Sequence, residues 1–183
     1  HVDETYIKII GEWAYVFLFI SSKNLVLSAY HLAHSRETLP AVVTMTEAIR
    51  TADPQQKISL ITDGNPSYPA GIHFINEKRP KELPRIEHHA VIGLQNLDKE
   101  SETYRAFKQL IERLNRTFKF HVRPASGFKS DNGALSLVVL FATHYNFLRP
   151  HISLGYKTPI EIPELQNIST IQGQCIKILS MAD

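Results

Sequence analysis

The stretch VDETYIKIIGEWAYVFLFISSKNLVLSAYHL, residues 2–32, contains three apolar segments rich in β-branched and aromatic residues. These segments are residues 2–10, 13–20 and 25–32, and only short polar breaks separate them. Because short breaks join neighbouring antiparallel strands, the stretch predicts a three-stranded antiparallel meander. The middle segment has the continuous apolar run of a strand buried on both faces, so we expect Trp13, Phe17 and Phe19 in the core.

Beyond the meander, helical and strand-like segments alternate. Apolar residues at helical spacing predict helices over residues 36–51, 68–76, 101–120 and 133–147, whereas short apolar runs predict strands over residues 58–62 and 85–92. This order predicts an α/β fold of the ribonuclease H-like kind, with a mixed sheet of three antiparallel strands then two parallel strands, flanked by helices. In such a sheet the first strand lies beside the fourth as a parallel neighbour.

Composition fits one globular domain with a core and a short tail, since 43% of the 183 residues are apolar and 21% are charged. The net charge of +2 does not by itself indicate a nucleic-acid partner. The lone Cys175 excludes an internal disulfide and fits a reducing cytoplasm. The longest apolar run, residues 13–20, is far shorter than the ~20 residues of a membrane span, so no membrane partner is expected.

The helix over residues 101–120, SETYRAFKQLIERLNRTFKF, is amphipathic. Its polar side sets one carboxylate, Glu112, among four cations, which are Arg105, Lys108, Arg116 and Lys119. One interpretation is that this side of the helix is exposed to solvent and carries ion pairs between residues four apart, Lys108 with Glu112 and Glu112 with Arg116. The other is that Glu112 belongs to a site formed with other segments.

Two aspartates favour the second interpretation. Asp3 lies in the first predicted strand and Asp63 ends the fourth, so adjacent strands bring them together, and a helix can carry Glu112 over the same edge. Three carboxylates form an oxygen-only site suited to hard divalent cations, and two such ions ~4 Å apart can support phosphoryl displacement. Taken singly, Asp63 is also typical of a turn residue and Asp3 of an exposed strand edge.

Four motifs resemble a known family. VDETY at residues 2–6, TDGNPSY at 62–68, IERLNRTFK at 111–119 and YNFLRPHISLGYKTPIE at 145–161 are similar to motifs of the catalytic core of DDE transposases and retroviral-type integrases, closest to bacterial and archaeal insertion-sequence transposases. The resemblance implies a catalytic core over residues 1–164 and a C-terminal tail of unclear role over residues 165–183. It implies a transposase that cleaves transposon ends and joins the 3′-hydroxyl to target DNA by two-metal phosphoryl transfer.

The resemblance also implies roles for particular residues. Asp3, Asp63 and Glu112 are the catalytic metal-binding triad, holding two Mg²⁺ or Mn²⁺ ions. Lys119 matches the family's basic residue that contacts transposon-end DNA. The other expected DNA contacts flank that face or lie in a basic loop expected near the active-site edge, and they are Asn115, Arg116, Arg123 and Lys129. The expected partners are transposon-end and target DNA and further copies of the chain, as a homodimer or higher multimer, in the cytoplasm at a prokaryotic nucleoid.

The sequence departs from the family pattern in two respects. The gap between Asp63 and Glu112 is longer than usual, which predicts an inserted loop or hairpin within residues 80–100. The family's usual N-terminal DNA-binding module does not occur in this sequence, so we expect site-specific end recognition to reside in such a module. Two alternative functions stay open: a ribonuclease H-like nuclease without strand transfer, and a domesticated core that binds DNA without cutting it.

Overall fold

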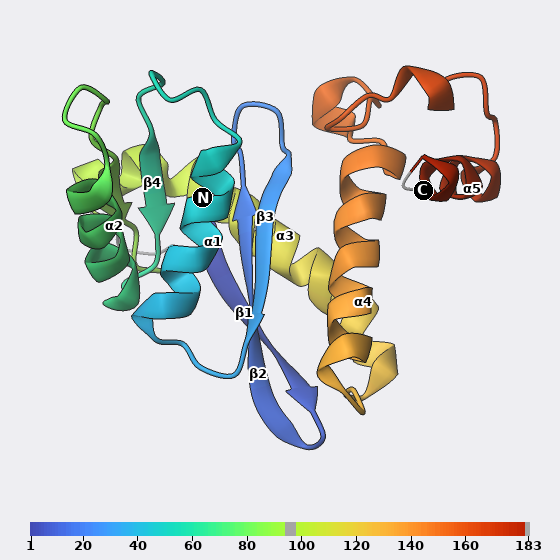
Figure 1. Ribbon diagram of the computed structural model, residues 1–183, viewed down its shortest axis with the longest axis horizontal. Coiled ribbons are helices and arrows are strands. Elements are labelled where there is room, and N and C mark those ends of the chain that lie inside the picture. The colour runs from blue at the N-terminus through green and yellow to red at the C-terminus, as the bar shows by residue number, and fades with distance from the viewer. Residues whose placement is uncertain (94–97, 182–183) are drawn as a thin grey trace.

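A computed structural model describes residues 1–93 and 98–181, and an antiparallel sheet lies at its centre (Figure 1). Strands β1 (Val2–Ile9), β2 (Glu12–Ile20) and β3 (Leu27–Ala33) pair in that order, with Asp3 opposite Leu18. Ile10 and Gly11 have φ values of 51° and 84° and form the tight turn between β1 and β2. The predicted meander is therefore confirmed.

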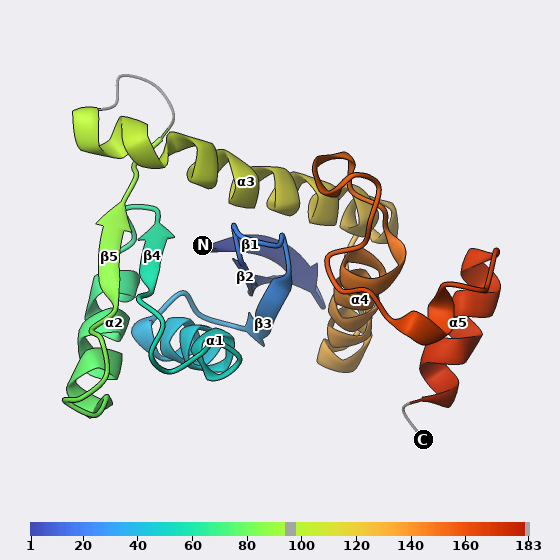
Figure 2. The ribbon, with the colours of Figure 1, turned by 90° about the horizontal axis from the view of Figure 1, so that it is seen from above.

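Beside this sheet, β4 (Ser59–Thr62) and β5 (Glu87–Ala90) form a parallel pair (Figure 2). β4 lies next to β1, as the predicted strand order requires. In the described part of the chain, however, no backbone ladder joins the two strands, so the expected continuous sheet is divided in two. β4 is only four residues long, and the link is made by side chains: Asn65, just after β4, donates a hydrogen bond of 3.2 Å to Glu4 of β1.

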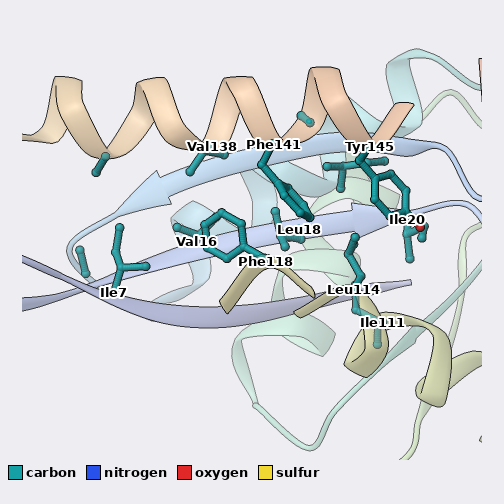
Figure 3. Packing of buried hydrophobic residues seen from close by; sticks show 14 of the residues in the cluster. Ile7, Val16, Leu18, Ile20, Ile111, Leu114, Phe118, Val138, Phe141 and Tyr145 are labelled. Carbon is teal, nitrogen blue, oxygen red and sulfur yellow. The ribbon is translucent and has the colours of Figure 1, made fainter. Parts of the chain in front are cut away.

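Helices cover both faces of the three-stranded sheet (Figure 2). α1 (Thr38–Arg50) packs on one face with α2 (Ser67–Lys78) beside it, and α3 (Lys99–Val122) and α4 (Asp131–Thr143) pack on the other. Side chains of β2 alternate between two cores. Val16, Leu18 and Ile20 meet α3 and α4 (Figure 3), whereas Phe17 and Phe19 meet α1. Trp13 was expected in the core, but it lies opposite Lys8, next to the turn between β1 and β2, and is 51% exposed.

The ends of the helices follow from their caps. The side chain of Asp98 accepts a hydrogen bond of 2.8 Å from the Ser101 amide, and Ser130 similarly caps α4 by accepting from the Gly133 amide at 3.1 Å. The α-helical part of α4 ends earlier than predicted because the chain continues as a π-turn, η2 (His144–Leu148). Short 3₁₀ turns also occur, at η1 (Arg123–Ala125), η3 (Ile152–Leu154) and η4 (Pro163–Leu165).

Two further segments differ from expectation or extend it. Within residues 80–100 the chain forms no hairpin in its described part: β5 pairs with β4, and residues 94–97 lie outside the described ranges. Within residues 165–183, expected to be a tail of unclear role, α5 (Ile171–Ser180) forms, and the Thr170 side chain caps it. Across residues 1–93 and 98–181, none of the helices has the length and apolar character needed to cross a membrane.

Candidate active site

Three carboxylates from two strands converge at one edge of the molecule. Oxygens of Asp3 and Glu4, at the start of β1, and of Asp63, directly after β4, all lie within 4.8 Å of one another. Asp63 also lines a cleft of about 490 Å³ beside this cluster. The other residues that line the cleft are Arg36, Gly64, Asn65, Pro66, Ile92 and Gly93. The structure therefore brings Asp3 and Asp63 together, as adjacent strands predict.

Asp3 is held from the side of α3. Its Oδ2 oxygen accepts a hydrogen bond of 3.0 Å from Asn115 Nδ2 and lies 3.7 Å from Lys108 Nζ. Burial raises the pKa of Asp3 from its ordinary value of 3.8 to about 6, against the opposing effect of Lys108; the charges of Glu4 and Asp63 add to the rise. Asp3 is thus ionised at neutral pH but retains a proton more readily than an exposed aspartate.

Glu112 lies on the face of α3 that meets Asp3, because it is four residues after Lys108 and three before Asn115. It is half-buried, but it is not part of the group of carboxylates within 4.8 Å. The ion pairs expected for a solvated surface do not form either: within the described chain Glu112 pairs with neither Lys108 nor Arg116, and Lys108 is buried against Asp3. The face of α3 around Glu112 is therefore directed toward Asp3, and it does not carry the ion pairs of an exposed surface.

Glu4, which sequence reasoning missed, is bound by protein donors on both of its oxygens. Arg36 Nε donates to Oε1 at 2.8 Å, Asn65 Nδ2 donates to the same oxygen at 3.2 Å, and the Tyr68 hydroxyl donates to Oε2. Burial raises the pKa of Tyr68, so its hydroxyl remains a donor. With its side chain 3% exposed, Glu4 joins β1 to the turn after β4 and is a structural link rather than a free ligand.

Asp63 also forms the turn that its position in the sequence suggests. Its Oδ1 accepts from the Asn65 amide at 2.9 Å, and Asn65 Oδ1 accepts from the Ser67 amide at 3.0 Å. These two successive Asx turns lead directly into α2 and fix the carboxylate of Asp63 at the end of β4. The turn role and the site role are therefore compatible, because the turn uses only one oxygen.

Comparison with known proteins identifies the family and supports the fold. The family model DDE_Tnp_IS240, described as a DDE domain, matches residues 1–146. The chain belongs to this DDE-domain family. The DDE domain resembles a chain in the cryo-electron microscopy structure of the simian T-cell lymphotropic virus intasome in complex with PP2A regulatory subunit B56 gamma. The TM-score is 0.58 and the sequence identity is 15%. The match covers 92% of this chain and 58% of that chain, and it confirms the ribonuclease H-like fold. A search of curated proteins finds no significant match.

The donor atoms of the DDE domain fit a hard divalent cation. Asp3 and Asp63 offer carboxylate oxygens, which are the ligands that Mg²⁺ and Mn²⁺ prefer. Asn115 Oδ1 is buried and has no hydrogen-bond partner in the described structure, although Nδ2 of the same amide is bound to Asp3. An unsatisfied buried acceptor is costly, and a water molecule held by a cation would satisfy it. Glu112 is the further carboxylate on the same helix face.

The basic residues expected to contact DNA lie at different distances from these carboxylates. Lys119 Nζ lies 3.8 Å from the centroid of the Tyr6 ring, three residues along β1 from Asp3. The loop that carries Lys129 is elsewhere: the Phe128 amide donates to the Lys8 carbonyl at 2.8 Å, at the far end of β1. Five residue steps at ~3.3 Å each put Lys8 about 17 Å from Asp3. The expectation that this loop lies near the active-site edge is wrong.

Proposed function

We propose that this DDE domain is the catalytic core of a DNA transposase, which cleaves transposon ends and joins the 3′-hydroxyl to target DNA. The observation that carries the proposal is the convergence of Asp3 and Asp63 within 4.8 Å at the meeting point of β1, β4 and the polar face of α3. Adjacent strand ends that present carboxylates to an open cleft suit a phosphodiester substrate better than an enclosed pocket would.

In this proposal Asp3, Asp63 and Glu112 hold two Mg²⁺ or Mn²⁺ ions. When bound, such ions lower the pKa of an attacking water or hydroxyl and stabilise the charge on the phosphoryl oxygens. Glu112 enters the site from a face that already contacts Asp3 through Lys108 and Asn115. Asn115 orients Asp3 by donating to its Oδ2, while the other oxygen, Oδ1, accepts from the Glu4 amide at 3.0 Å.

The remaining roles concern DNA and assembly. Lys119, Arg116, Asn115, Arg123 and Lys129 bind the DNA backbone, and the last two lie farther from the carboxylates than the others. The core extends to residue 164, beyond the family match, because the segment after η2 folds back: the Ile160 amide donates to the Asn146 carbonyl at 3.0 Å. The active form is a homodimer or higher multimer on paired DNA ends, at the nucleoid in a prokaryotic cytoplasm.

A strand-transfer assay tests the proposal. The chain is incubated with a supercoiled plasmid and a labelled duplex that ends in a free 3′-hydroxyl, in Mg²⁺ or Mn²⁺. We expect labelled plasmid products, and their loss by at least about a hundredfold in Asp3→Asn, Asp63→Asn and Glu112→Gln, because each variant removes a charged ligand. Glu77→Gln, which changes an exposed carboxylate on α2, serves as the matched control and retains activity.

Each alternative function has its own outcome in this assay. Nicked plasmid without joined label indicates a nuclease that lacks strand transfer. Salt-sensitive DNA binding with neither nicking nor joining in either metal indicates a non-catalytic DNA-binding core. Full joining by Glu112→Gln, together with loss in the two aspartate variants, would remove Glu112 from the triad while leaving the transposase assignment in place.

A further inference from the structure

A second groove lies on the other side of α3 from the carboxylates. It has a volume of about 460 Å³ and runs between α3 and the segment that follows η2. Apolar side chains, among them Leu110, Leu114 and Tyr145, line it together with three arginines, Arg113, Arg116 and Arg149. No aspartate or glutamate is among the residues that line it in the described chain. The groove is therefore apolar within and cationic at its rim.

The helix geometry separates this groove from the active site. At ~100° per residue, Lys108, Glu112 and Asn115 share one face of α3, and Arg113 projects about 130° away from their mean direction, on the solvent side. Arg116 lies between the two faces, about 60° from both Arg113 and Lys119. A cationic path therefore crosses the exposed side of α3 from the face that meets Asp3 to the groove.

The arginine charges of the groove are not neutralised by the protein. None of Arg113, Arg116 and Arg149 forms an ion pair with a carboxylate in residues 1–93 and 98–181. Arg149 Cζ lies 6.0 Å from the centroid of the Tyr145 ring. Burial raises the pKa of Tyr145, and the positive charges of Arg149 and Arg113 both oppose that rise.

The wall opposite α3 is anchored. Asn146 in η2 binds both backbone groups of Leu27, accepting from its amide at 2.9 Å and donating to its carbonyl at 2.9 Å. The Arg149 amide closes the π-turn by donating to the His144 carbonyl at 2.8 Å, and the His151 amide donates to the Lys157 carbonyl at 2.9 Å. These bonds hold the backbone that carries Arg149 in place before any ligand binds, which reduces the entropy cost of binding.

We propose that this groove, with Arg113 and Arg149 on its two walls, binds phosphates of a DNA strand that continues from the active-site face across Arg116. The proposal rests on the proposed function, because it takes DNA as the substrate. From Ala106 to Thr117 the helix side of the groove is ~16 Å long, enough for several successive phosphates of one strand. Guanidinium groups suit phosphate because they donate paired hydrogen bonds in one plane.

The test is the salt dependence of duplex binding. Fluorescence anisotropy with a labelled 30-base-pair duplex, without divalent metal, gives Kd between 50 and 200 mM NaCl for the chain and for Arg113→Gln/Arg149→Gln. We expect the slope of log Kd against log salt to fall by about 0.9 for each lost phosphate contact, so by about 1.8, with affinity at least tenfold weaker at low salt. The matched control, Arg50→Gln/Lys78→Gln, removes two exposed cations on α1 and α2 and leaves the slope unchanged.

Further measurements keep the proposal open to refutation. Arg113→Lys/Arg149→Lys keeps both charges and should keep the slope, so it separates charge from packing if the glutamine variant unfolds at a lower temperature. Sedimentation of the same proteins without DNA identifies a protein occupant. If the glutamine variant changes the oligomeric state but not the slope, the groove is an interface between chains and the proposal is wrong.

The strand-transfer assay separates failure of this proposal from failure of the proposed function. If the chain joins DNA while the glutamine variant binds duplex with an unchanged slope, the groove proposal is wrong and the transposase assignment stands. If the chain binds duplex through the groove, with the predicted change of slope, but never cuts or joins it, the catalytic assignment is wrong and the groove proposal stands. If it binds no duplex at all, both are wrong.

Discussion

Lys108 Nζ lies 3.7 Å from Asp3 Oδ2, and the two side chains are only 7% and 13% exposed. A buried ammonium beside a carboxylate cluster neutralises part of the repulsion among the acids when no metal is bound. The same ammonium repels a divalent cation that approaches Asp3. If the proposed metal site is correct, we expect Lys108 to stabilise the metal-free domain and to weaken metal binding.

The first prediction concerns this competition. Lys108→Met removes the positive charge while keeping a similar apolar stem, so we expect Mg²⁺ to bind at least about fivefold more tightly at pH 8, roughly 1 kcal/mol. Isothermal titration calorimetry measures the change. Lys108→Arg keeps the charge and should bind Mg²⁺ within about twofold of the unaltered chain. Weaker binding by Lys108→Met would mean that Lys108 supports the bound state instead.

The second prediction follows from the pKa of Asp3, which is raised to about 6. Below that pH the carboxyl carries a proton that a metal ion must displace, and above it the carboxylate is already ionised. Mg²⁺ affinity should therefore rise with pH through about 6 and become level above pH 7. Titrations at pH 6 in buffers of different ionisation enthalpy should show release of about half a proton for each ion bound. Affinity that is flat between pH 5 and 7 would contradict the raised pKa.

The third prediction concerns stability without metal. Since the folded-state pKa of Asp3 is above its ordinary value of 3.8, ionisation costs the folded state free energy, and its contribution to stability declines as pH rises from about 4 to about 6. Asp3→Asn carries no such charge. We expect it to be more stable than the unaltered chain at pH 8 in EDTA, by at most about 3 kcal/mol, and equally stable near pH 4. Urea unfolding at the two pH values measures this difference.

The fourth prediction tests the hydrogen bonds around Glu4. Glu4→Gln removes the charge from a side chain that is 3% exposed and that accepts from Arg36, whose own side chain is 49% exposed, so it should lower the free energy of unfolding by about 1–3 kcal/mol. Tyr68→Phe removes one donor to the same carboxylate and should cost about 1–2 kcal/mol. Because the two residues interact, a double-mutant cycle should show non-additive losses. Additive losses would indicate that Tyr68 and Glu4 contribute independently.

The fifth prediction concerns the anchor of the π-turn. Asn146→Ala removes two buried hydrogen bonds to Leu27 and leaves both backbone groups unsatisfied, which should cost about 2–4 kcal/mol in urea unfolding. Asn132→Ala changes an exposed asparagine in the first turn of α4 and should cost less than about 0.5 kcal/mol. Equal losses in the two variants would argue against an anchoring role for Asn146.

Local patterns were sufficient for the elements of the fold and for two of the site residues. The meander follows from β-branched runs separated by short breaks, and α3 follows from its apolar stripe and polar face. Asp3 and Asp63 could be paired from the strand order, because β1 and β4 lie side by side. The helical spacing of apolar residues predicted an α-helix that continued past Thr143. The structure instead changes there from α-helix to a π-turn.

By itself, the sequence determined the order of strands and helices, the ribonuclease H-like topology and the approach of Asp3 to Asp63, because backbone periodicity is a local property and few topologies connect such an order of elements. Only the tertiary structure decided that Lys108 is buried against Asp3, that Asn115 reaches the same oxygen from 112 residues away, and that Glu112 remains outside the tight cluster. It also separated the loop of Lys129 from the carboxylates. These relations depend on how α3 rotates and slides against the sheet, and that position is set by packing in the core rather than by any local pattern.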